Sequence, residues 1–251
     1  MKIAVITGAS SGMGREFAKR IEKTDKFDEL WLIARRAERL RELESELGTP
    51  VRVLPLDLTV QADIDSYAAL LQKEQPQVAV LINASGYGKF GRFTDVPLDE
   101  QLGMLDLNAK ALTAMTYHTL PFMPEGGQIY EICSISAFQP VPYIGVYAAT
   151  KSYVLSFTRA LNVELKGRIK AMAVCPFWVR TEFFDRAVRD DTVTYYSRYL
   201  TAEQVVTAAL RDMKRGKDVS VCGFMNKAQA LVCKLLPHRL VMAIWCRQQK
   251  K

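Results

Sequence analysis

The chain has 251 residues, of which 49% are hydrophobic and 24% are charged. This length is ample for one domain with a large core, and the composition excludes a disordered or fibrous protein. The formal net charge of +7 is unevenly spread, because residues 226–251 carry six basic side chains and no acidic one, which leaves residues 1–225 nearly neutral. An evenly basic surface of the kind that binds nucleic acid is therefore not expected.

Short apolar runs alternate with helical patterns along the first 225 residues. Runs such as residues 3–6 and 78–82 are apolar throughout, as expected for parallel strands that are buried on both faces. The sequence predicts strands at 2–7, 29–34, 51–56, 78–83, 128–133, 169–175 and 218–222, and helices at 12–23, 36–47, 64–73, 98–120, 146–165 and 202–214.

This alternation predicts an α/β fold of the Rossmann type, a doubly wound parallel sheet of seven strands with helices on both faces. Pro55 in the third strand suits an edge position, because proline cannot donate to a neighbouring strand. The strand order 3-2-1-4-5-6-7 places it there. We expect residues 1–225 to form a single catalytic domain and residues 226–251 to form a basic, amphipathic helical extension.

The cysteines and histidines indicate whether the chain forms disulfides or a metal site. The five cysteines show no C-x-x-C spacing, and the two histidines are far apart, so neither a disulfide framework nor a metal site is predicted. Reduced thiols and a cytoplasmic location are expected. No apolar run approaches the 18 or so residues that a membrane-spanning helix requires.

A glycine-rich turn joins the first predicted strand to the first predicted helix. Residues 7–14 read TGASSGMG. Glycines there let the backbone approach a pyrophosphate bound at the N-terminus of the helix, although a plain tight turn would use them as well. The G-x-x-x-G-x-G spacing, with Thr7 in front, resembles the short-chain dehydrogenase/reductase family in its compact single-domain branch.

The end of the second strand indicates which dinucleotide is bound. An NAD site places an acidic residue there to bind the ribose 2′-hydroxyl, but this chain has Ala34 followed by Arg35 and Arg36. No carboxylate would repel a 2′-phosphate, and a guanidinium can pair with it. We predict NADP(H), with Arg35 as the contact and Ser10 assisting, and we interpret Arg36 as a solvated residue of the next helix.

The resemblance implies further cofactor contacts after the other strands. It implies that Asp57 contacts the adenine and that Asn83 ties strand ends together, whereas Phe177 replaces a glycine that the family usually has. Ala84 and Ser85 also depart from the family's usual residues. The predicted cofactor-binding residues are Gly8, Ser10, Ser11, Gly12, Met13, Gly14, Arg35, Asp57, Leu58, Asn83, Ala84, Ser85, Tyr147, Lys151, Pro176, Val179 and Thr181.

Tyr147 and Lys151 carry the strongest catalytic signal, because at i and i+4 they lie on one face of a helix. Ser134 lies thirteen residues upstream of Tyr147, just beyond the fifth strand, and Asn108 lies in the preceding long helix. With the glycine turn, these residues match the family over residues 3–181 in the right order. The predicted catalytic set is therefore Asn108, Ser134, Tyr147 and Lys151.

These residue types suit the interconversion of a ketone and an alcohol. The Lys151 ammonium and the positive nicotinamide are expected to lower the pKa of Tyr147, which would then be the general acid in reduction and the general base in oxidation. The resemblance implies that Ser134 stabilises the carbonyl oxygen, that Lys151 holds the nicotinamide ribose, and that Asn108 holds a relay water. The cofactor supplies the hydride.

The predicted substrate region is strongly aromatic, which suits a bulky apolar ketone such as a steroid or a 3-oxoacyl thioester. The sequence thus favours a carbonyl reductase or a hydroxysteroid-type dehydrogenase. The candidate lining residues, of which about half are expected to be core, are Tyr87, Phe90, Phe93, Phe138, Tyr143, Phe177, Trp178, Phe183, Phe184, Tyr195 and Tyr196.

The basic extension has two apolar stripes at helical spacing, one around Leu231 and Leu235 and one around Leu240 and Ile244, separated by Pro237. Peripheral membrane contact is one interpretation. A subunit contact or a flap packed over the substrate lid is the other. The resemblance also implies a homodimer or homotetramer, built on the two long helices at 98–120 and 146–165.

Two other functions stay open. A catalytically silent NADP-binding regulator would have lost Ser134, Tyr147 or Lys151, and all three are present. A membrane-associated scaffold that uses the extension would leave this intact set unexplained.

Overall fold

A parallel sheet of seven strands forms the centre of the computed structural model, which describes residues 1–188, 192–194 and 199–250. The strand order is β3-β2-β1-β4-β5-β6-β9. The predicted fold class and strand order are therefore confirmed, with β9 in the place of the seventh strand. The strands are β1 (Lys2–Thr7), β2 (Glu29–Ile33), β3 (Val51–Leu54), β4 (Gln77–Asn83), β5 (Gln128–Ile132), β6 (Lys170–Val174) and β9 (Val219–Ser220).

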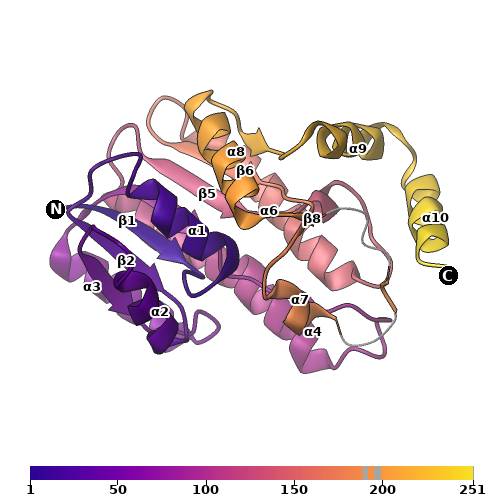
Figure 1. The fold of residues 1–251 in the computed structure, drawn as a ribbon, viewed down its shortest axis with the longest axis horizontal. Helices are drawn as coiled ribbons and strands as arrows, with labels where there is room; N and C mark the ends of the chain where they lie inside the picture. The colour runs from indigo at the N-terminus through magenta and orange to yellow at the C-terminus, as the bar shows by residue number, and fades with distance from the viewer. Residues whose placement is uncertain (189–191, 195–198, 251) are drawn as a thin grey trace.

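Helices cover both faces of the sheet (Figure 1). On one face, Phe17 of α1, Val205 of α8 and Ile6 of β1 belong to one buried cluster. On the other face, Ile64 of α3 and Leu161 of α6 belong to the cluster around the opposite side of β1. The side chains of β1 alternate between these two cores, which is why the strand is apolar at every position. The helices are α1 (Gly12–Ile21), α2 (Ala37–Glu44), α3 (Gln61–Glu74), α6 (Gly145–Glu164) and α8 (Ala202–Lys214).

The predicted helix at 98–120 differs in the structure. It consists of α4 (Leu98–Leu105), a π-helical turn η1 (Asp106–Ala111), α5 (Leu112–Thr119) and a short 3₁₀ turn η2 (Leu120–Phe122). The extra residue that a π turn inserts is a feature often found at functional sites. Asn108 lies in this turn.

The register of the strands brings their carboxyl ends to one edge of the sheet. Thr7 pairs with Ile33 on one side and with Asn83 on the other. Pro55 follows β3 directly instead of lying inside it, because the strand ends at Leu54, and β3 is at the edge of the sheet as predicted. Beyond the carboxyl ends lie η3 (Ile135–Phe138), α7 (Phe183–Ala187) and a small second sheet of β7 (Trp178–Val179) and β8 (Tyr199–Leu200).

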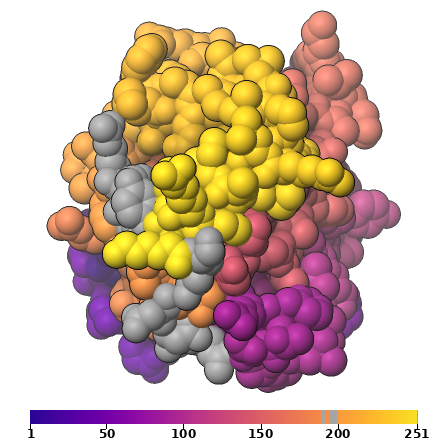
Figure 2. All heavy atoms as spheres, turned by 90° about the vertical axis from the view of Figure 1, so that its right-hand side faces the viewer, coloured from indigo at the N-terminus to yellow at the C-terminus, as the bar shows by residue number. Residues whose placement is uncertain are grey.

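Two helices form the C-terminal extension, α9 (Phe224–Leu235) and α10 (His238–Gln248). They lie at the end of the molecule opposite the N-terminus (Figure 1) and on the outer surface of that face (Figure 2). Val241 of α10 and Ala230 of α9 are buried in one cluster with Phe138 and Val154. None of the helices in the described part of the chain is long and apolar enough to cross a membrane.

Candidate active site

Two adjoining cavities lie at the carboxyl edge of the sheet. One is a cleft of about 1060 Å³, which reaches from the glycine turn to Asp57 and Arg186. The other is a pocket of about 300 Å³, which contains Ser134 and Tyr147 and is closed partly by α9 and α10. The two cavities share five lining residues, Met13, Ala84, Gly86, Thr181 and Phe183.

The glycine turn is packed so closely against the loop after β4 that a side chain at Gly8 is excluded. Gly8 has a φ of +66°, and a Cβ there would lie 2.7 Å from the backbone of Ala84 and Ser85. The Ser85 amide donates to Thr7 Oγ1 at 3.1 Å, which fixes the loop after β4 against the turn. Ser11 precedes α1 without capping it through its side chain, so the first amides of the helix face the cleft. This arrangement fits the pyrophosphate of a dinucleotide.

Both arginines after β2 line the cleft. Arg35 Nη1 lies 3.7 Å from Asp57 Oδ2. Arg36 donates from Nη2 to Ser10 Oγ at 3.2 Å and pairs through Nη1 with Glu182 Oε2 at 2.9 Å. Arg36 is exposed at the N-cap of α2, as interpreted, and its guanidinium also lies beside Ser10, the residue expected to assist a phosphate contact.

Most of the predicted cofactor residues lie on these two cavities, but Asn83 does not. Its amide donates to Thr116 Oγ1 at 3.0 Å and to Glu131 Oε1 at 3.1 Å, so it ties β4 to β5 and α5 from below the site. The residues found on the cleft are Gly8, Ser10, Ser11, Gly12, Met13, Gly14, Arg35, Asp57, Leu58, Ala84, Ser85 and Thr181, and those on the pocket are Met13, Ala84, Tyr147, Lys151, Pro176, Val179 and Thr181.

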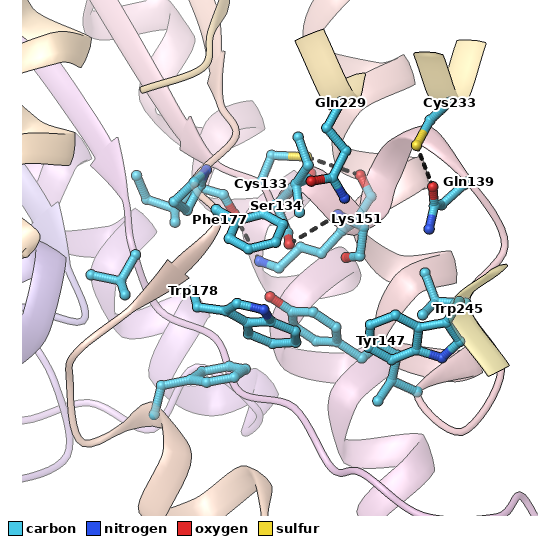
Figure 3. A pocket seen from close by; sticks show the side chains of 18 of the residues that line it. Cys133, Ser134, Gln139, Tyr147, Lys151, Phe177, Trp178, Gln229, Cys233 and Trp245 are labelled. Carbon is cyan, nitrogen blue, oxygen red and sulfur yellow. Dashed lines mark hydrogen bonds between the residues drawn. The ribbon is translucent and has the colours of Figure 1, made fainter. Parts of the chain in front are cut away.

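Ser134, Tyr147 and Lys151 come together on one wall of the pocket (Figure 3). Ser134 follows β5, and its hydroxyl accepts from the Ser136 amide at 3.2 Å and lies near enough to Tyr147 to affect its pKa. Tyr147 and Lys151 are one turn apart on α6, and Lys151 Nζ donates to the carbonyl oxygen of Ile132 at 2.7 Å. All three side chains are buried. The three residues are thus brought together as the sequence indicated.

Burial affects the protonation of both Tyr147 and Lys151. Among the protein's own groups, burial is the largest effect, and it raises the pKa of Tyr147 although the Ser134 side chain lowers it. Burial also lowers the pKa of Lys151, whose Nζ lies 5.7 Å from the centroid of the tyrosine ring. The expectation that Lys151 and the positive nicotinamide together lower the pKa of Tyr147 concerns the site with its cofactor bound, and for that state it stays a prediction.

The side chain of Asn108 is fully engaged by the protein. Its Oδ1 accepts from the Tyr87 amide at 3.0 Å, and its Nδ2 donates to the Tyr87 carbonyl at 2.8 Å and to Thr150 Oγ1 at 3.1 Å. Asn108 therefore fixes the loop after β4 against α6. Whether it also holds a relay water stays a prediction that would involve its backbone.

A buried carboxyl group lies behind this wall. Glu131 on β5 is fully buried, and its Oε1 accepts from Thr116 Oγ1 at 2.8 Å and from Asn83. Its Oε2 and Asn83 Oδ1 are buried without a hydrogen-bonding partner among the described residues. Burial raises the pKa of Glu131 to about 7, although Thr116, Asn83 and Lys151 act against this shift.

The other walls of the pocket are mainly aromatic and aliphatic. Phe177 packs against Trp178 with ring centroids 5.7 Å apart, and Trp245 of α10 donates from Nε1 to the Pro142 carbonyl at 3.0 Å. Of the predicted lining residues, Phe177, Trp178, Phe183 and Phe184 line the pocket, whereas Phe93 is exposed and Tyr195 and Tyr196 lie outside the described residues. Sequence reasoning did not assign the residues that the extension contributes, which are Gln229, Val232, Cys233, Leu236, Val241, Ile244, Trp245 and Gln248.

Comparison with known proteins places the chain in a family. The family model described as short chain dehydrogenase matches residues 2–192. An uncharacterised oxidoreductase of Staphylococcus epidermidis is 31% identical over 183 residues, which are 72% of this chain and 79% of that protein. The chain therefore belongs to the short-chain dehydrogenase/reductase family, and it is an oxidoreductase that acts on CH–OH or C=O groups.

Solved structures resemble the whole chain, including the extension. A short-chain dehydrogenase from Sphingobium yanoikuyae in complex with NADPH has a TM-score of 0.79 and 29% identity, with 97% of this chain and 96% of that chain covered. The bulky-bulky ketone specific alcohol dehydrogenase from Comamonas testosteroni has a TM-score of 0.73 and 25% identity, with 99% and 92% covered.

The buried carboxyl group gives a prediction about stability. Because the pKa of Glu131 is raised from 4.5 to about 7 in the folded chain, the stability of the wild type falls as the pH rises through this range. Glu131→Gln cannot ionise, so its stability carries no such dependence on pH. We expect the variant to be more stable than the wild type by about 3 kcal/mol at pH values above 7 and to lose most of this advantage towards pH 5.

Urea unfolding of both proteins at the two pH values measures this difference. Glu125→Gln, at an exposed position, is the matched control and should leave the pH dependence unchanged. A constant difference between Glu131→Gln and the wild type across the pH range would contradict the explanation.

Proposed function

We propose that the protein is an NADP(H)-dependent reductase of bulky apolar ketones, with Tyr147 as the general acid. The observation that carries this proposal is the position of Ser134, Tyr147 and Lys151 on the wall of an apolar pocket that adjoins the dinucleotide cleft. A regulator or scaffold without turnover has no need of such a pocket.

The cleft and the pocket suggest how the parts of the cofactor would be held. The amides at the start of α1 would bind the pyrophosphate, and Arg35, Arg36 and Ser10 would bind a 2′-phosphate. Lys151 has three N–H donors, of which one is used on Ile132, so the others are available for the ribose hydroxyls. When bound, the nicotinamide supplies the hydride.

The chain's own groups would handle the carbonyl oxygen and the proton. Ser134 and Tyr147 line the same pocket, and their hydroxyls would donate to the carbonyl oxygen as negative charge develops on it. Tyr147 then releases its proton to that oxygen. Because burial raises the pKa of Tyr147, the side chain is protonated at neutral pH, which is the form that reduction requires.

The lining of the pocket supports the proposed substrate class. About 300 Å³ is at the lower end of the range for small-molecule sites, and the rings of Phe177, Trp178 and Trp245 face it. This supports a steroid-like or 3-oxoacyl substrate. The similarity to a structure described as bulky-bulky ketone specific points in the same direction.

The remaining predictions on assembly and location belong to the proposal as well. Leu98, Leu102 and Leu105 of α4 are exposed, which supports a homodimer or homotetramer built on that helix. All five cysteines are free thiols, which supports a cytoplasmic location.

Replacing the general acid tests the mechanism. Tyr147→Phe removes the proton donor while the ring still fills the wall, so kcat for ketone reduction should fall by on the order of 100-fold or more. The Kd for NADPH, measured by fluorescence titration, should stay within about twofold. Tyr153→Phe, on the exposed side of the same helix, is the control and should be fully active. Turnover of Tyr147→Phe near that of the control would overturn the assignment.

Replacing the arginines tests the cofactor preference. Arg35→Ser and Arg36→Ser should each weaken NADPH binding by about tenfold, because each removes a charged partner of the 2′-phosphate, and neither should weaken NADH binding. Arg39→Ser, on the helix α2 that follows the two arginines, is the control, because the partner of Arg39 is Glu42. Wild-type protein that binds NADH as tightly as NADPH would refute the preference.

A further inference from the structure

The outer face of α9 exposes large apolar side chains. Phe224, Leu231 and Leu235 are 83%, 57% and 74% exposed. Their spacing of seven and four residues puts them on one side of the helix, opposite the buried Ala230 and Cys233. We call these three residues the apolar stripe. A contiguous exposed patch of this kind marks an interaction surface rather than ordinary solvent-exposed surface.

Basic side chains accompany the apolar stripe. Lys227 and Lys234 follow one edge of the stripe on α9, and Arg239 and Arg247 are exposed on α10. From residue 226 to the end of the chain the sequence contains six basic residues and no acidic one. This combination of an exposed apolar face and basic flanks is typical of helices that lie in the interface of a membrane.

The exposed apolar surface continues into the substrate pocket. Val232 of α9 and Ile244 of α10 are about half exposed, at 47% and 45%, and both also line the pocket. On α9, Val232 lies between the apolar stripe and the pocket-lining residues Gln229 and Leu236. Val232 and Ile244 therefore lie at the boundary between the exposed apolar surface and the pocket.

The charge distinguishes between two occupants of this surface. A second copy of the chain in a two-fold contact would bring the same patch against itself, and the two basic segments would repel each other. An anionic lipid surface attracts them, by about 1 kcal/mol for each lysine or arginine near it.

We infer that α9 and α10 dock the protein on an anionic lipid surface, and that the apolar carbonyl substrate enters the pocket from the lipid between these helices. The second part rests on the proposed function. The docking itself depends on the apolar stripe and the basic residues alone.

Flotation of the purified full chain with NADPH tests the docking. The protein should float with vesicles of phosphatidylcholine and phosphatidylserine, float much less with phosphatidylcholine alone, and dissociate as salt is added. Absence from the anionic vesicles would overturn the inference.

Two double variants, each with a matched control, separate the apolar and the electrostatic contributions to vesicle binding. Phe224→Ser with Leu235→Ser should reduce the fraction bound to anionic vesicles by about tenfold, whereas Val60→Ser with Val163→Ser, at exposed positions elsewhere, should not. Lys227→Glu with Lys234→Glu should reduce it similarly, whereas Lys73→Glu with Lys214→Glu should not. An equal loss of vesicle binding in a control pair would show that the apolar stripe and its lysines are not the docking surface. A different result would identify a second copy of the chain as the partner of this surface. In that case the wild type would not bind vesicles, and Phe224→Ser with Leu235→Ser would dissociate an oligomer.

A kinetic measurement tests the entry route. With a ketone dissolved in vesicles, the stripe variant Phe224→Ser with Leu235→Ser should show a raised apparent KM, and with a water-soluble ketone its KM and kcat should match the wild type. If the KM of this variant for the ketone in vesicles equals that of the wild type, entry from the lipid between α9 and α10 is rejected. Tyr147→Phe should float like the wild type, so a failure of the proposed reaction is seen separately from a failure of docking.

Discussion

The hydrogen bond from Lys151 to the Ile132 carbonyl joins the two elements on which the site depends. It fixes α6 against the end of β5, and so it sets Tyr147, one turn before Lys151, opposite Ser134, which follows β5. A buried ammonium group is costly unless it is hydrogen-bonded, so this bond is required by burial as well as by geometry. The position of the reacting groups follows from a stability requirement of the core.

The same burial gives the catalytic groups their protonation states. The pKa of Tyr147 is raised and that of Lys151 is lowered, because a low-dielectric surrounding disfavours both charged forms. A tyrosine that stays neutral is ready to donate a proton, whereas a tyrosinate needs an additional positive charge to form. These protonation states suit the proposed role of Tyr147 as the proton donor in reduction.

The sequence was sufficient for the fold and for the centre of the site because both depend on local patterns. Apolar runs and the glycine turn specify the strand order and the cleft, and the spacing of Tyr147 and Lys151 places both on one helical face. The contacts of Arg36 were not predicted because its partners, Ser10 and Glu182, are 26 and 146 residues away. Such contacts leave no periodic signal. The π-helical turn at Asn108 was missed for a similar reason, since its hydrogen bonds with Tyr87 come from another loop.

The arrangement of α9 and α10 in the structure is needed to interpret the uneven charge of the chain. As a sequence, the basic segment is compatible with a lid, a subunit contact or a membrane contact. In the structure it is a lid on its inner side, where Trp245 and Val241 close the pocket, and it presents the apolar stripe on its outer side. Because a helix can bury one face while it exposes another, these two roles do not compete. A nearly neutral body with a basic, apolar end would orient on a negative surface with the pocket towards the lipid, and this is the orientation in which a poorly soluble ketone would reach Tyr147 by the shortest path.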